Sequence, residues 1–139
     1  KMMFEMVGPA SFFAEDWDSY GLDKNNEAAA ELFGVMLGSE IDKDIIGTDE
    51  LQEVMKPISA YAWINENSVP SVIAYGTYDK VAPFKAVKHL VNALKENNVD
   101  YKYFEATHSG HGLQNDDKIY KEYMETVEEY LDKYIPVEK

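Results

Sequence analysis

The sequence predicts an α/β fold in which about three parallel strands form one sheet with crossover helices. A first strand opens the chain, and two further strand-like runs are each followed by a segment whose apolar residues recur at helical spacing. This alternation of strands and helices is typical of parallel sheets. With 139 residues, 45% of them hydrophobic, the chain has enough apolar material for one compact domain.

The first strand is predicted over residues 1–7, and it ends at the turn signal Gly8-Pro9. Residues 10–68 follow as a helical insertion. Because the strand begins at once, without a signal peptide or a polar leader, we expect the chain to be the later part of a longer protein. A cytoplasmic location is expected, with secretion left open because an amino-terminal part would precede this sequence.

Two helices are predicted within the insertion. The first begins after the possible caps Asn25-Asn26 and ends at Gly38. Its apolar positions at helical spacing are Ala29, Leu32, Phe33, Met36 and Leu37. A shorter helix is predicted to begin with Thr48 as its cap and an acidic first turn, and to end before Pro57.

The second half of the chain predicts two strands and two helices. Residues 70–75 form a short apolar run closed by Gly76, as expected of a buried parallel strand. A helix follows Pro83 and ends at residues 97–98; its apolar stripe is Phe84, Val87, Leu90, Val91 and Leu94. Residues 101–105 alternate like a third strand. The last helix carries Ile119, Tyr123, Val127, Tyr130, Leu131 and Tyr134 on one face.

Composition excludes several classes of function. The formal net charge is -13, from 26 acidic residues and 13 basic ones, all lysine, which disfavours a nucleic-acid partner. The absence of cysteine excludes disulfides, thiolate zinc sites and a cysteine nucleophile. No apolar run approaches the roughly 20 residues that span a bilayer, so no membrane span is expected. We also expect no cofactor and no metal.

Polar residues follow the second and third strands at the edge of a parallel sheet where chemistry usually gathers. Asp79 follows the second strand, and His108 and His111 follow the third. Neighbouring parallel strands would bring these loops together. A carboxylate that accepts from one imidazole nitrogen leaves the other free to take a proton from a serine hydroxyl. Asp79 and a histidine of the next loop are therefore candidates for the acid and base of a catalytic triad.

At these residues the chain resembles a known family. Residues 69–83, around Asp79, and Ser109-Gly-His111-Gly-Leu113 together look like the carboxyl-terminal half of an α/β-hydrolase of the esterase, lipase and carboxylesterase-like group. In that family the aspartate stands in Gly-x-x-Asp-x-x-x-Pro and the histidine in Gly-His-Gly. The resemblance implies that Asp79 and His111 are the triad acid and base, that the opening strand is the family's sixth, and that residues 10–68 are its variable cap.

The resemblance also implies that the nucleophile lies upstream, because the triad serine precedes the acid and the histidine in these hydrolases. No Gly-x-Ser-x-Gly surrounds any serine of the chain. The serines are Ser11, Ser19, Ser39, Ser59, Ser68, Ser71 and Ser109. We therefore expect a fragment of a serine hydrolase of carboxylic esters that is inactive alone. A small-molecule ester is the expected substrate of the parent protein, with thioester and peptide left open.

A second hypothesis, from a different class of function, is that the chain is a non-catalytic module that binds a partner or self-associates. The aspartate and histidine patterns would then be relics. This hypothesis rests on the strand at residues 2–7, which would expose an unpaired edge if the sheet began there. The isolated chain is then expected to self-associate. A nucleophile elbow upstream is the sequence feature that would separate the two readings.

Each candidate residue also has a plainer interpretation. His111 could be a loop residue whose flanking glycines serve the turn, and Asp79 a turn or cap residue ahead of a proline. Asp116 and Asp117 are weaker rivals of Asp79, because they are expected to begin the last helix.

The other histidines are expected to have no catalytic role. His108 could join His111 and Asp116 in a metal site, but it lacks the fixed helical spacing of zinc motifs, so a solvated loop residue is preferred. His89 is expected at the surface or partly packed. Aromatic residues and a methionine of the insertion could line an acyl pocket, although a core role is the safer assumption: Trp17, Tyr20, Phe33 and Met36.

Overall fold

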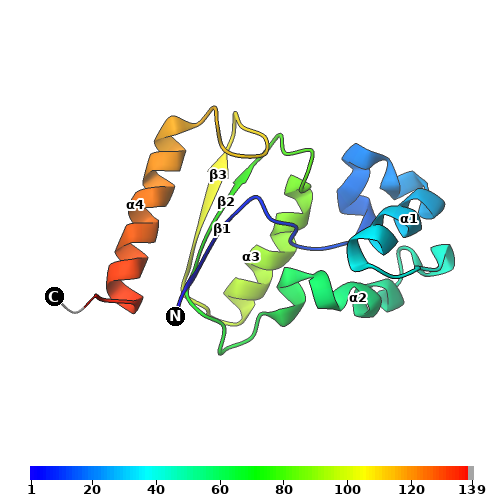
Figure 1. Ribbon diagram of the computed structural model, residues 1–139, viewed down its shortest axis with the longest axis horizontal. Coiled ribbons are helices and arrows are strands. Elements are labelled where there is room, and N and C mark those ends of the chain that lie inside the picture. The colour runs from blue at the N-terminus through cyan, green and yellow to red at the C-terminus, as the bar shows by residue number, and fades with distance from the viewer. Residues whose placement is uncertain (138–139) are drawn as a thin grey trace.

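The computed structural model describes residues 1–137, and in them one sheet contains three parallel strands (Figure 1). The strands are β1 (Met3–Met6), β2 (Ser71–Gly76) and β3 (Tyr101–Ala106), with β2 in the middle. Met3 lies opposite Ser71 in the first parallel pair. The predicted three-stranded parallel sheet is confirmed.

Helices cover both faces of the sheet (Figure 1). α3 (Val87–Glu96) packs on one face and α4 (Asp117–Tyr134) on the other. All six residues of β2 are buried, so its side chains alternate between two cores. The core under α4 contains Val72, Ala74, Tyr123 and Val127, and the core under α3 contains Ile73, Tyr75, Leu90 and Leu94. This burial on both faces explains why β2 reads as a continuous apolar run.

The segment between β1 and β2 contains α1 (Asn26–Leu37) and α2 (Asp49–Met55). Five short 3-10 helices flank them: Ala14–Tyr20, Leu22–Lys24, Lys43–Ile45, Lys56–Ile58 and Ala60–Trp63. α1 begins as predicted, because the Asn25 side chain accepts a hydrogen bond from the Ala28 amide at 3.0 Å. It ends at Gly38, whose φ of 77° suits glycine.

The cap predicted for α2 is wrong in one respect. Thr48 occupies the position before the helix, but its side chain accepts no hydrogen bond from α2. Its hydroxyl instead donates to the Ile45 carbonyl at 2.7 Å, in the turn that precedes the helix. A short hydroxyl side chain can satisfy either the helix or the preceding turn, and sequence does not distinguish them.

The insertion packs around a core of its own. Trp17 and Phe33 are fully buried, and Trp17 stacks on Phe12 with ring centroids 5.5 Å apart. The core role expected for these two residues is therefore correct. Tyr20 and Met36 are exposed instead. In Figure 1 this unit lies beyond α3, on the side of the molecule opposite α4.

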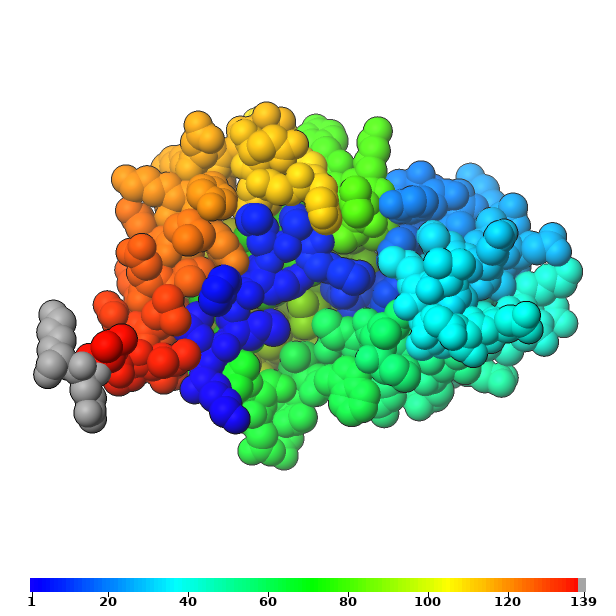
Figure 2. Space-filling model, viewed as in Figure 1, coloured from blue at the N-terminus to red at the C-terminus, as the bar shows by residue number. Residues whose placement is uncertain are grey.

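β1 lies at one side of the sheet, and among residues 1–137 only β2 pairs with it. Its outward side chains Phe4 and Met6 are 57% and 37% exposed. In Figure 2 the amino-terminal segment lies uncovered along the visible face of the molecule. Among residues 1–137, none of the helices combines the length and the apolar character that a membrane span requires.

Candidate active site

The loops after β2 and β3 lie together at one end of the sheet, as adjacent parallel strands require (Figure 1). Asp79 stands in the first loop and His111 in the second. Nδ1 of His111 lies 2.9 Å from Oδ2 of Asp79, within hydrogen-bond distance. The sequence predicted that these two residues would meet, and the structure brings them together.

Backbone amides fix the carboxylate of Asp79. Its side chain is fully buried, and Oδ1 accepts from the amides of Val81 at 2.7 Å and Ala82 at 3.0 Å. The second oxygen, Oδ2, faces His111. The aspartate thus makes turn contacts and a histidine contact together, one through each oxygen, so the plainer turn role and the triad role are compatible.

His111 is held on one side and open on the other. Its side chain is 45% exposed, and within residues 1–137 its only side-chain hydrogen bond is the one to Asp79. When Nδ1 is protonated and donates a hydrogen bond to Asp79, Nε2 of the neutral ring has a free lone pair. This nitrogen can accept a proton from a hydroxyl presented at the surface of the loop. The arrangement therefore has the geometry of a general base with its orienting acid.

Gly76 allows the two loops to approach each other. A Cβ at this position would lie 2.2 Å from the Gly110 carbonyl oxygen and 2.5 Å from that of Ser109. The Tyr78 amide donates to the Ser109 carbonyl at 3.0 Å, which joins the aspartate loop to the histidine loop. A larger residue at Gly76 would separate the acid from the base.

His108 pairs with a different carboxylate. Its side chain is 76% exposed, as expected of a solvated loop residue, but its Nδ1 lies 3.0 Å from Oδ1 of Asp116. Asp116 precedes α4 without making a side-chain cap to that helix. The histidines thus contact separate carboxylates, and the described part of the chain contains no group of three or more metal-ligating side chains.

Sequence reasoning missed the roles of Asp116 and Ser109. Oδ2 of Asp116 accepts from the Ser109 hydroxyl at 2.6 Å and from the His108 amide at 3.0 Å. These hydrogen bonds, that of Ser109 first, lower the pKa of Asp116. Only the short distance between the two residues in sequence hinted at this contact, because an aspartate ahead of a helix is ordinarily read as a cap.

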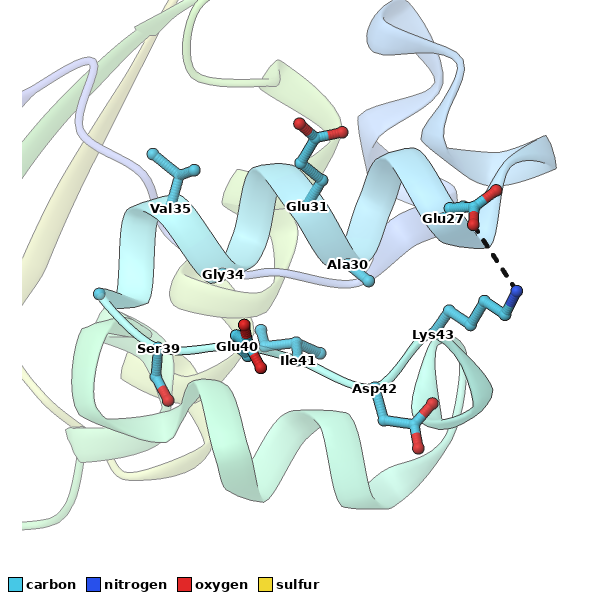
Figure 3. A pocket seen from close by; sticks show the side chains of 11 residues that line it. Glu27, Ala30, Glu31, Gly34, Val35, Ser39, Glu40, Ile41, Asp42 and Lys43 are labelled. Carbon is cyan, nitrogen blue, oxygen red and sulfur yellow. Dashed lines mark ion pairs between the residues drawn. The ribbon is translucent and has the colours of Figure 1, made fainter.

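Two hollows of the surface differ in whether they adjoin Asp79 and His111. One of about 260 Å³ adjoins Asp79, and the insertion contributes Asp16, Asp18 and Ser19 to it. A larger one of about 730 Å³ lies between α1 and residues 38–43. Figure 3 shows Glu27, Ala30 and Gly34 of α1 at this hollow. Neither Asp79 nor His111 lines the larger hollow.

Comparison with known proteins places the chain in a family. The model of the prolyl oligopeptidase family matches residues 16–137. The chain belongs to the prolyl oligopeptidase family. The partial α/β-hydrolase fold expected from sequence is confirmed for this family member. A comparison with curated protein sequences gave no significant match.

Solved structures support the same fold. An esterase of Thermogutta terrifontis matches with a TM-score of 0.58 at 20% identity, over 98% of this chain and 42% of the esterase. An acetyl ester-xyloside bifunctional hydrolase from Caldicellulosiruptor lactoaceticus matches with a TM-score of 0.63 at 17% identity, over 99% of this chain and 43% of the hydrolase. The Thermogutta terrifontis esterase 2 phosphorylated by paraoxon matches with a TM-score of 0.50 at 23% identity, over 60% of this chain and 34% of the esterase. The chain thus spans less than half the length of these proteins.

Proposed function

We propose that this chain supplies the general base and the orienting acid of a serine hydrolase that cleaves carboxylic esters. The observation that carries the proposal is the contact of 2.9 Å between His111 Nδ1 and a buried oxygen of Asp79, with the other face of the ring open. Membership of the prolyl oligopeptidase family supports the hydrolase part of the proposal, and the likeness to ester hydrolases favours an ester over a peptide as substrate.

In the proposed mechanism His111 and Asp79 act in both halves of an acyl transfer. Nε2 of His111 takes the proton of a serine hydroxyl as its oxygen attacks the ester carbonyl, and then gives that proton to the leaving alcohol. Water, deprotonated at the same nitrogen, resolves the acyl-enzyme. Asp79 holds the imidazole in the productive tautomer and stabilises the imidazolium.

The nucleophile and the oxyanion hole are proposed to come from a segment upstream of residue 1. Among residues 1–137 no serine hydroxyl is hydrogen-bonded to His111. None of the chain's serines stands in the Gly-x-Ser-x-Gly setting of a nucleophile elbow. On this proposal the chain alone does not turn over an ester, and the longer polypeptide does.

A small acylated molecule is the proposed substrate. Two of the matched structures are a thermophilic esterase with propionate bound and an acetyl ester-xyloside bifunctional hydrolase, which favours short acyl groups. The hollow beside Asp79 has both polar and apolar lining, since Pro83 and Phe84 lie there beside acidic, hydroxyl and lysine side chains, and its volume of about 260 Å³ suits a small substrate.

The test is ester hydrolysis by the complete gene product with p-nitrophenyl acetate as substrate. Replacing Asp79 by Asn is expected to lower kcat by about 10,000-fold, because the imidazole loses the carboxylate that fixes its tautomer. His111→Ala is expected to lose at least as much. His108→Ala is the matched control and should retain activity, since its ring faces Asp116. Full activity in His111→Ala would overturn the proposal.

The second candidate function is a non-catalytic module that self-associates or binds a partner. The unpaired edge of β1, with its exposed Phe4 and Met6, is the specific observation that favours it. The two candidates separate on the test above, because a non-catalytic module gives no hydrolysis that depends on His111.

A further inference from the structure

We propose that Asp116 is a positioning residue that holds His111 against Asp79 by bracing the loop after β3. This inference rests on the proposed function, because it concerns the position of His111, the proposed general base. Asp116 does not touch the reacting atoms. It acts on the backbone that carries the histidine.

The need for a brace comes from the loop itself. Glycines precede and follow His111, and Gly112 has a φ of 114°. The next residue, Leu113, is buried with a φ of 58°, a conformation unusual for a leucine. Glycines give the backbone many alternative conformations, so contacts elsewhere must select the one in which Nδ1 of His111 faces Asp79.

The carboxylate of Asp116 makes those contacts. Its side chain is 6% exposed, and it accepts hydrogen bonds from the Ser109 hydroxyl and the His108 amide. The Ser109 hydroxyl in turn accepts from the Asn115 amide at 3.0 Å. Residues 108 and 109, at the start of the loop, are thus tied to residues 115 and 116 at its end. His111 lies within the segment that this network closes.

Ser109 connects Asp116 to the loop that contains Asp79. Its hydroxyl is bound by Asp116, and its carbonyl accepts from the Tyr78 amide, one residue before Asp79. Ser109 is fully buried, so neither bond competes with water. A charged acceptor makes the hydroxyl bond of 2.6 Å a strong one. Removing it frees the residue at which the two loops meet.

The test is proton NMR of the histidine ring protons in the complete gene product. In the unsubstituted chain we expect a slowly exchanging Nδ1 proton of His111, assigned by its loss in His111→Ala. Asp116→Ala is expected to abolish this signal through exchange with water. Asp116→Asn should retain it, because the amide oxygen can still accept from the Ser109 hydroxyl and the His108 amide. Asp117→Ala, at the neighbouring exposed carboxylate, is the matched control and should also retain the signal.

Ser109→Ala provides a second variant if Asp116→Ala fails to fold, which the methyl signals of the two cores would reveal. It removes the hydroxyl bond without leaving an unpaired charge, and the same loss of the Nδ1 signal is expected. Persistence of the signal at its original exchange rate in the folded variants would overturn the positioning role and leave the acid and base pair intact. Absence of the signal from the unsubstituted chain would instead overturn the pairing of His111 with Asp79, and the positioning role with it.

Discussion

Glu5 lies on β1, where its carboxyl meets one hydroxyl and one peptide group. The Gly8 amide donates to Oε1 at 2.6 Å, and Oη of Tyr75 lies 2.9 Å from Oε1 and 2.6 Å from the Gly8 carbonyl. The single hydroxyl proton of Tyr75 cannot serve both oxygens. A protonated Glu5 resolves this, because Tyr75 then donates to Gly8 and receives from Glu5. Burial raises the pKa of Glu5 above its ordinary 4.5, which agrees with a neutral acid.

This raised pKa predicts a pH dependence of stability. The folded chain binds the Glu5 proton more tightly than the unfolded chain. Protonated Glu5 therefore stabilises the fold fully below pH 4.5, and this stabilisation is lost as the pH rises through the pKa of Glu5 in the folded chain. Glu5→Gln should keep the contacts, because its amide nitrogen can donate to Tyr75. The variant should not lose stability as the pH rises, because the amide does not titrate. Urea unfolding from about pH 4 to about pH 8 should therefore show the variant gaining stability relative to the original chain as the pH rises.

Glu66→Gln, at an exposed position, is the control and should follow the original chain at every pH. An unchanging difference between Glu5→Gln and the original chain would mean that Glu5 has the same pKa folded and unfolded.

At the scale of elements, one buried carboxylate fastens the insertion to α3. Asp16 accepts from Nζ of Lys88 at 2.7 Å, and its other oxygen lies 2.7 Å from Nε2 of His89. Phe13 stacks on the His89 ring with centroids 4.1 Å apart. His89 is thus partly packed, within the range expected from sequence, and its partner lies in the insertion.

Asp16→Ala is predicted to destabilise the chain by about 2 kcal/mol, because it removes a buried acceptor of two hydrogen bonds to cationic or ionisable groups. The neighbouring pair of Asp18 with Lys85 is exposed on both sides, so Asp18→Ala should destabilise the chain much less than Asp16→Ala. Free energies of unfolding in urea measure both. Equal losses in the two variants would show that the buried contact adds nothing beyond a surface ion pair.

The elements themselves were largely predictable. α1, α3 and α4 repeat apolar residues at helical spacing, and β2 is an apolar run, so local pattern determined them. The meeting of Asp79 with His111 followed from the rule that neighbouring parallel strands end at one edge. The contacts of Asp16 with His89 and of Asp116 with Ser109 depend on how side chains turn after folding. No periodicity records them, and sequence reasoning therefore missed both.

At the scale of the whole molecule, the free edge of β1 predicts self-association of the isolated chain. Unpaired backbone donors and acceptors on a strand with exposed apolar side chains favour pairing with a second copy. Light scattering should give a mass above the 15.9 kDa of one chain. The double variant Phe4→Lys, Met6→Lys should be monomeric, since lysine on an edge strand opposes pairing.

Val35→Lys is the control for added charge, because Val35 is 76% exposed on α1, away from the sheet. It should leave the self-association unchanged. A stable monomer of the original chain at high concentration would contradict the prediction.

The division of a catalytic site between this chain and an upstream segment can be tested by covalent labelling of the complete gene product with paraoxon. Peptide mass spectrometry should find the phosphoryl group on a serine outside residues 1–139. Its rate of attachment should fall by about 100-fold or more in His111→Ala, because the serine loses its general base, and should be unchanged in His108→Ala. An adduct on one of the chain's own serines, or an undiminished rate in His111→Ala, would contradict the proposed division.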